Sequence, residues 1–240
     1  ALQYFLHQQG NDVSIINYDV APPTVKNCGR NIIEKIKNQP HKYLTKYALY
    51  KYKAQILNRN KKMVSEIQKN CNFTDRIQSE EELIENCNKF DLLICGSDQI
   101  WNSLHANGKD PAFYLDFVPN DKVKAAYAAS FATDTISDEY KIMTKSLVEK
   151  LDKVGVREES GVKIVKDLGI EKAVNVLDPV FLLEKEQWDN IATKEFNEKY
   201  ILVYDFDKSL VIEALAKEIS KKKGYKIYTI NVDKPKYADK

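Results

Sequence analysis

The sequence predicts an α/β fold with a doubly wound parallel sheet, and three observations lead to this prediction. Short apolar runs end at turn or polar residues, as strands do, at 13–18, 91–95, 123–129, 153–157, 174–177, 200–206 and 225–230. Several of these runs are almost continuously apolar, which is typical of strands that helices cover on both faces. Amphipathic stretches lie between the later runs, and such alternation of strands and helices indicates this fold class.

The helices are predicted from apolar residues that recur at helical spacing. The chain opens with Leu2, Phe5 and Leu6 in such a pattern. Because a domain of this class usually opens with a strand, we expect a first strand and its turn to precede residue 1. Three more stretches share the helical pattern, namely 138–151, 160–168 and 208–223.

One segment holds the positive charge of the chain. The whole sequence carries 37 Lys and Arg against 35 Asp and Glu, but residues 26–76 hold thirteen of the first kind and three of the second. Residues 31–70 show no strand pattern and place Leu49, Tyr52, Ile56 and Met63 at helical spacing among lysines. We therefore expect an inserted helical arm, which is either a solvated amphipathic face or a surface for anionic lipid or a phosphorylated substrate.

Composition excludes several classes of protein. Hydrophobic residues make up 43% of the chain, which is too much for disorder. No apolar run approaches the roughly 18 residues that span a bilayer, and the first residues resemble no secretory leader. The four cysteines, Cys28, Cys71, Cys87 and Cys95, form no Cys-x-x-Cys pair, so we expect neither a disulfide scaffold nor a metal site. This use of cysteine leads us to expect a cytoplasmic location. The near-balanced total charge predicts no nucleic-acid partner.

We expect two domains with a boundary near residue 195. Residues 1–195 form the first domain and carry the basic helical insertion at about 26–76. The polar stretch 193–199 precedes a fresh strand, helix and strand, so residues 196–240 form the first β-α-β unit of a second domain. One such unit is too small to close its own core, and we expect the chain to end inside that domain.

The most distinctive motif follows the apolar run at 91–95. Ligands bind at the carboxyl ends of such strands. Gly96 would let the backbone approach a ligand closely. The next residues offer a hydroxyl, a carboxylate, amides and a stacking ring, a mixture that suits a sugar, in Ser97, Asp98, Gln99, Trp101 and Asn102. A capped turn without a ligand is the alternative, and the motif is not a nucleotide-binding loop.

Two further residues follow strand-like runs. Ser130 ends the small-residue run at 123–129, and no histidine has an evident reason to lie beside it, so we favour binding over nucleophilic catalysis. Arg157 is one of four arginines beside 33 lysines. Its planar guanidinium suits a carboxylate or phosphate, which makes it the leading anion binder. The alternative is a structural ion pair with Glu158, Glu159 or Asp178.

These motifs together resemble the polysaccharide pyruvyl transferase family. The resemblance runs in order along nearly the whole chain, through the opening Ala1-Leu2-Gln3, Gly96–Asn102, 113–117, 127–131, 156–158 and 177–183 with Trp188. It implies two Rossmann-like domains that face one another, similar to the GT-B glycosyltransferases. One departure is Ala132, where the family often has glycine.

The resemblance also implies an activity. Family members look like enzymes that move pyruvate from phosphoenolpyruvate onto two hydroxyls of a sugar, as a ketal on a bacterial surface polysaccharide. Phosphoenolpyruvate and a saccharide or lipid-linked glycan would be the partners, with no further cofactor. Arg157 matches the family's donor-side arginine, and Asp98 is the best carboxylate to deprotonate the acceptor. The family's C-terminal histidine is not found before Lys240, so we expect this chain alone to be inactive.

Two alternatives stay open at this point. One is a nucleotide-sugar-dependent glycosyltransferase of the same GT-B architecture, which would bind a nucleoside diphosphate in place of phosphoenolpyruvate. The other is a non-catalytic basic module that binds anionic membrane or glycan through residues 26–76, peripheral at the inner face of the membrane. Salt-sensitive binding to liposomes would distinguish the second.

Overall fold

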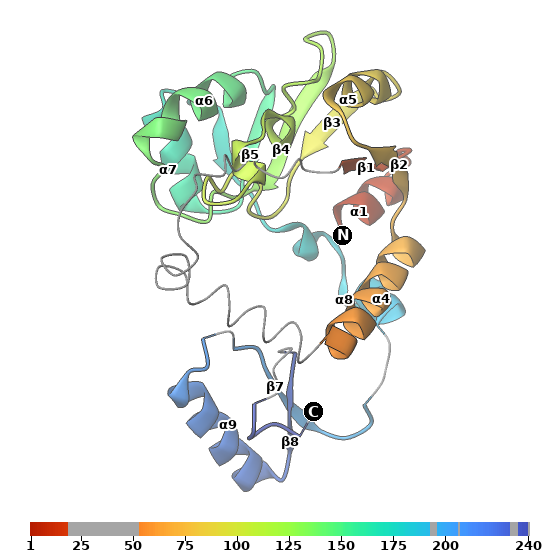
Figure 1. The fold of residues 1–240 in the computed structure, drawn as a ribbon, viewed down its shortest axis with the longest axis vertical. Helices are drawn as coiled ribbons and strands as arrows, with labels where there is room; N and C mark the ends of the chain where they lie inside the picture. The colour runs from red at the N-terminus through yellow and green to blue at the C-terminus, as the bar shows by residue number, and fades with distance from the viewer. Residues whose placement is uncertain (19–52, 193–195, 206, 231–234, 240) are drawn as a thin grey trace, which may run out of the picture. The chain divides into compact units, whose positions relative to one another are not determined.

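The computed structural model describes residues 1–18, 53–192, 196–205, 207–230 and 235–239. The chain divides into two compact units, one of Ala1–Lys26 with Cys71–Trp188 and one of Asn27–Asn70 with Asp189–Lys240. Both units are mixed α/β with parallel sheets, consistent with a Rossmann-like fold (Figure 1). The domain boundary near 195 and the insertion at 26–76 stay predictions, and the part of that insertion before residue 53 lies outside the described residues.

The first unit contains a four-stranded parallel sheet, in the order β3-β4-β5-β6. Its strands are β3 (Leu92–Cys95), β4 (Val123–Ala129), β5 (Lys153–Val156) and β6 (Ala173–Asn175). All four lie within or beside the apolar runs that predicted them. Because the strands are parallel, their carboxyl ends meet at one edge of the sheet.

A second parallel pair in this unit joins β1 (Ile15–Tyr18) to β2 (Phe73–Ile77). The first of these strands was predicted and the second was not. The sequence Phe-Thr-Asp-Arg-Ile of β2 is half polar, and only its two ends are apolar. The last residues of the predicted basic insertion, 73–76, therefore belong to a strand.

The helix α5 of the first unit begins at a recognisable cap. In α5 (Glu80–Cys87) the Ser79 hydroxyl accepts the Glu82 N–H at 3.2 Å, and the Glu82 carboxylate accepts the Gln78 N–H at 2.8 Å. The remaining α-helices are α1 (Leu2–Gln8), α6 (Asp138–Val148), α7 (Glu159–Asp167) and α8 (Lys185–Ile191), which crosses into the second unit. Three short 3₁₀ helices follow strands, namely η1 (Asn107–Lys109), η2 (Pro111–Tyr114) and η3 (Pro179–Leu182).

The core of the first unit packs helices against the sheet. Val154 and Val156 of β5 and Val165 of α7 are at most 1% exposed. Gly161 lets α7 approach β5 closely, because a Cβ there would lie 3.3 Å from Val156 Cβ. Leu83 of α5 belongs to the same buried cluster. Burial of these side chains fixes the strand ends, and so the residues that follow them.

The second unit shows the predicted β-α-β unit. β7 (Tyr200–Val203) pairs in parallel with β8 (Lys226–Thr229), and α9 (Leu210–Lys223) connects them. The unit also contains α4 (Lys53–Asn70), which lies where the sequence predicted a helical arm. Across the described residues, no helix has both the length and the apolar character needed to cross a membrane.

Candidate active site

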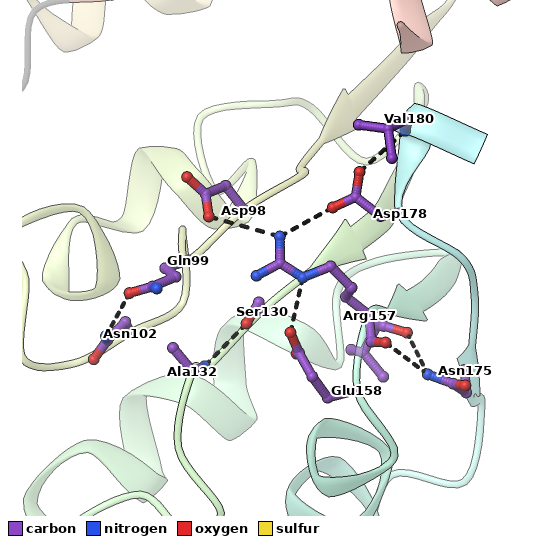
Figure 2. A network of polar contacts seen from close by, with 11 residues as sticks. Asp98, Gln99, Asn102, Ser130, Ala132, Arg157, Glu158, Asn175, Asp178 and Val180 are labelled. Atoms are coloured by element: carbon purple, nitrogen blue, oxygen red, sulfur yellow. Dashed lines mark hydrogen bonds and ion pairs between the residues drawn. The ribbon is translucent and has the colours of Figure 1, made fainter. Parts of the chain in front are cut away.

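The candidate site lies where β3, β4 and β5 end. Hydrogen bonds between main chains continue past the strands, since the Ser130 N–H donates to the Asp98 carbonyl at 2.9 Å and the Arg157 N–H donates to the Ala129 carbonyl at 3.0 Å. Asp98 and Ala129 also form an isolated parallel bridge. The structure therefore brings three residues singled out by the sequence, Asp98, Ser130 and Arg157, to one place (Figure 2).

Gly96 allows the main chain to leave β3 beside β4. Its φ is +120°, and a Cβ at this position would lie 2.1 Å from the Tyr127 carbonyl oxygen. The sequence predicted that the backbone at Gly96 approaches a ligand closely. In the structure it approaches the neighbouring strand β4 closely instead. The following Gly96–Ser97 peptide bond is cis, Ser97 is half-buried, and Asp98 has a φ of 71°. The short polar side chain of aspartate tolerates this left-handed conformation better than most.

Ser130 has a structural contact of its own. Its side chain is fully buried, and its hydroxyl oxygen accepts the Ala132 N–H at 3.0 Å. This bond closes the turn after β4, in which Ala132 has a φ of 54°. Ala132 is the residue at which the family often has glycine, and the left-handed region favours glycine. The place of Ser130 in a substrate cleft stays a prediction.

Arg157 is the centre of the charged groups at this edge. Its Nε donates to Glu158 Oε1 at 2.8 Å, and its Nη1 lies 3.2 Å from Asp178 Oδ2 and 3.6 Å from Asp98 Oδ1. Of the ion pairs that the sequence left as an alternative for Arg157, those with Glu158 and Asp178 are formed, and none with Glu159 is found among the described contacts. The Arg157 side chain keeps 24% of its surface exposed, while that of Asp98 keeps 79%. The contact to Asp98 is the longest of the three and the most accessible to water.

Two opposing effects act on the pKa of the Arg157 guanidinium. Partial burial lowers it, because burial disfavours a charge. The hydrogen bond and charge of Glu158, followed by those of Asp178, outweigh burial and raise the pKa above its usual value. The guanidinium is thus held in its charged form, as an anion-binding group requires.

The third nitrogen of this guanidinium has a different environment. Among the described residues, no hydrogen bond or ion pair reaches Arg157 Nη2. In Figure 2 this nitrogen points toward the side on which Gln99 and Ser130 lie, and no dashed line reaches it. A guanidinium offers five N–H groups, and Nη2 carries two of them. An incoming carboxylate or phosphate therefore finds two donors there that face no described acceptor.

Asn175 and Asp178 hold Arg157 in position. The Asn175 side-chain amide donates to the Val156 carbonyl at 3.2 Å and to the Arg157 carbonyl at 3.0 Å. Asp178 uses its second carboxylate oxygen to accept the Val180 N–H at 3.0 Å, which starts η3. Asp178 therefore joins the guanidinium to the segment after β6. The Asp-Pro pair at 178–179 signals such a cap in the sequence, whereas Asn175 gave no signal beyond its place at a strand end.

The other predicted binding residues have different surroundings. The Trp101 ring is 1% exposed and packs between Tyr114 and Phe131, with ring centroids 5.3 Å from each. Asn102 is also buried and donates to the Gln99 side chain at 3.1 Å. Of the three residues that were predicted, only Gln99 is exposed. In this structure Trp101 offers no free face for stacking, and what it contributes is packing beneath the loop.

Among the residues that the structure describes, no group of three or more His, Cys, Asp and Glu could hold a metal ion. His105 is exposed in the loop before η1, and His41 falls outside the described ranges. The charged groups that this edge presents are the Arg157 guanidinium and, next to it, the exposed carboxylate of Asp98.

Comparison with known proteins gives one match. A family model described as polysaccharide pyruvyl transferase matches residues 1–238. Comparisons with curated proteins and with solved structures gave no match.

Proposed function

The chain belongs to the polysaccharide pyruvyl transferase family, and we propose that its reaction takes phosphoenolpyruvate as donor and two hydroxyls of a surface polysaccharide or its lipid-linked precursor as acceptor. The observation that supports this donor is the Arg157 guanidinium, charged and with Nη2 open toward Gln99 and Ser130. Phosphoenolpyruvate carries both a carboxylate and a phosphate. Either group can accept a hydrogen bond from Nη2, and two parallel bonds from Nη1 and Nη2 once the long contact of Nη1 with Asp98 is given up.

The proposed reaction balances without an added cofactor. The methylene carbon of phosphoenolpyruvate takes one proton, and the adjacent carbon becomes open to attack. The two sugar hydroxyls form two carbon–oxygen bonds to that carbon and lose their protons, while the bond from that carbon to the phosphate oxygen breaks. One hydroxyl proton balances the one on the new methyl group, and the other leaves with the phosphate. The product is a cyclic ketal that carries a carboxylate.

Asp98 has the position for the base in this scheme. It is exposed, it follows β3 directly, and its carboxylate lies 3.6 Å from Arg157 Nη1. A donor anion on Arg157 competes with Asp98 for the same positive charge. We propose that the donor displaces the Asp98 carboxylate, which then accepts the proton of a sugar hydroxyl beside the donor. Gly96, Ser97 and Gln99 are proposed to shape the surrounding surface, and the buried Asn102, Ser130 and Trp101 to support it from below.

The finer architecture belongs to the same proposal. A GT-B arrangement requires a second Rossmann-like domain, and we propose that β7, α9 and β8 belong to it. The glycosyltransferase alternative finds little support in this unit. At the start of α9, where a nucleotide phosphate would bind, the Asp205 carboxylate accepts the Asp207 and Ser209 N–H groups at 3.1 and 2.8 Å. A carboxylate in this place repels a phosphate.

Calorimetric titration of phosphoenolpyruvate tests the proposal. We expect Arg157→Gln to weaken binding by at least about tenfold, because a hydrogen bond to a charged group contributes roughly 1.5 to 3 kcal/mol. Arg76→Gln, on β2, removes the same charge outside the site and should leave the affinity unchanged. Equal affinities of Arg157→Gln and wild type would contradict the donor site. Binding of a nucleoside diphosphate in place of phosphoenolpyruvate would favour the glycosyltransferase.

A further inference from the structure

The helix α4 shows two faces of opposite character. Leu57, Val64 and Ile67 recur at intervals of seven and three residues, so they form one stripe, and Met63 lies beside it. Lys62 and Lys69 lie seven residues apart on the opposite side of the helix, among polar residues. The helix therefore has the division into apolar and basic faces that is typical of interfacial helices.

The apolar stripe of α4 is open to solvent. Leu57 and Val64 are each 50% exposed, Met63 is 54% exposed and Ile67 is 43% exposed. Every other α4 side chain whose burial is described is exposed as well. A stripe of four large apolar side chains in water is unfavourable, since each gains roughly 1.5 to 3 kcal/mol when fully buried. This helix therefore presents a surface that a partner would cover.

Charge indicates which partner fits this surface. Lys61 borders the stripe, next to Leu57, and Lys62 and Lys69 add two more positive charges within the width of one helix. Glu66 is the acidic residue of α4, and its main-chain carbonyl and its carboxylate accept hydrogen bonds from the Asn70 side chain. Positive charge beside exposed apolar residues complements a surface of anionic headgroups above hydrocarbon, where lysine stems reach outward to the headgroups.

We propose that α4 binds the surface of an anionic membrane, lying in the interface with Leu57, Met63, Val64 and Ile67 toward the lipid. The binding would be peripheral and reversible, because one short apolar stripe and a few lysines hold a protein only weakly at a bilayer. This inference does not rest on the donor or on the ketal chemistry, because Asp98 and Arg157, on which those rest, lie in the first unit and α4 lies in the second.

Co-sedimentation with lipid vesicles tests this proposal. We expect the chain to bind vesicles of phosphatidylglycerol and phosphatidylcholine in equal parts, and not vesicles of phosphatidylcholine alone. Binding should decrease as salt shortens the Debye length from about 30 Å at 0.01 M to about 3 Å at 1 M. The triple variant Lys61→Glu, Lys62→Glu, Lys69→Glu should bind at least about tenfold more weakly, because each lysine near such a surface contributes roughly 1 kcal/mol.

A matched control separates this surface from total charge. The triple variant Lys153→Glu, Lys163→Glu, Lys166→Glu changes the net charge equally, at exposed positions of β5 and of α7, whose apolar residues Ile164 and Val165 are buried, and should bind vesicles like wild type. Leu57→Ser with Val64→Ser should lose binding at unchanged charge, with circular dichroism to verify the fold. Equal loss in both lysine variants, or no binding by wild type, would overturn the proposal. A different result would also overturn it. If wild type is a dimer by light scattering, the Leu57→Ser, Val64→Ser variant is a monomer and neither binds vesicles, then the apolar stripe packs against a second copy of the chain.

Discussion

Replacing Asp98 with asparagine separates the two roles that the site assigns to its charged groups. In the ligand-free structure the Asp98 carboxylate lies 3.6 Å from Arg157 Nη1, so it occupies part of the charge that a donor anion needs. Asparagine keeps the size of the side chain and removes its charge. We therefore expect Asp98→Asn to bind phosphoenolpyruvate more tightly than wild type, although it removes the proposed base.

The size of this effect follows from the geometry. The Asp98 side chain is 79% exposed, and its contact with Arg157 is longer than those of Glu158 and Asp178. Exposed ion pairs of this kind contribute about 0.2 to 1 kcal/mol. Removing the competitor should therefore lower the dissociation constant of phosphoenolpyruvate by a factor of roughly 1.4 to 5. Removal of a negative charge near the bound donor acts in the same direction.

Calorimetry at low ionic strength measures the change, since salt would screen it. Asp116→Asn is a useful control, because Asp116 pairs with Lys150 at 2.5 Å in the same unit and has no contact with Arg157. This control should leave the dissociation constant unchanged. Weaker binding in Asp98→Asn would refute the reasoning, because it would mean that the Asp98 carboxylate holds the donor and does not compete with it.

Three further predictions concern the same edge of the sheet. Gly96→Ala should lower the free energy of unfolding by about 3 kcal/mol or more, because the added Cβ would lie 2.1 Å from a carbonyl oxygen of β4. Gly10→Ala is the control, because Gly10 also has a positive φ, +85°, but has open space around it, and it should cost only about 1 kcal/mol. Denaturant titrations measure both. Equal costs would contradict the close approach. Ala132→Gly should raise the free energy of unfolding by roughly 0.5 to 1 kcal/mol, because Ala132 is exposed and glycine removes the steric strain of its left-handed conformation, with a φ of 54°. A loss of stability would argue against that conformation. Asp178→Asn keeps an acceptor for η3 but removes the closer ion pair, which positions the guanidinium as well as sharing its charge. We expect the loss of positioning to outweigh the relief of a negative charge, so calorimetry should show several-fold weaker binding of the donor while the far-ultraviolet spectrum is unchanged. An affinity equal to or higher than that of wild type would show that Asp178 does not position Arg157.

Much of the fold follows from local sequence. The strands β3, β4 and β5 are predicted almost residue for residue, because they are short, apolar and buried by helices on the sheet. β2 escapes prediction because its residues are half polar and its pairing with β1 spans more than fifty residues of chain. α5 is also missed, although Ser79 with Glu82 three residues later is the sequence signature of a helix start.

The candidate site is predictable in its position and not in its contacts. Residues that follow parallel strands share one edge of the sheet, which is why Asp98 and Arg157 could be placed together. The sequence named Glu158 and Asp178 as possible partners of Arg157, but spacing alone could not decide between such ion pairs and a guanidinium free to bind an anion. In the structure the Arg157 guanidinium donates to the carboxylates of Glu158 and Asp178, and the Asn175 side chain donates to the Arg157 main-chain carbonyl. The aromatic Trp101 was expected at the surface, but the packing of two other rings buries it.

The most direct test of the central claim is a phosphorus NMR spectrum of phosphoenolpyruvate and uridine diphosphate mixed in one sample with the protein. A ligand that binds the protein shows a broadened phosphorus resonance, so the two ligands are compared in the same sample under identical conditions. The account predicts broadening of the phosphoenolpyruvate line, unchanged uridine diphosphate lines, and loss of the broadening in Arg157→Gln. Broadening of the uridine diphosphate lines alone, or of the phosphoenolpyruvate line equally in Arg157→Gln, would contradict it.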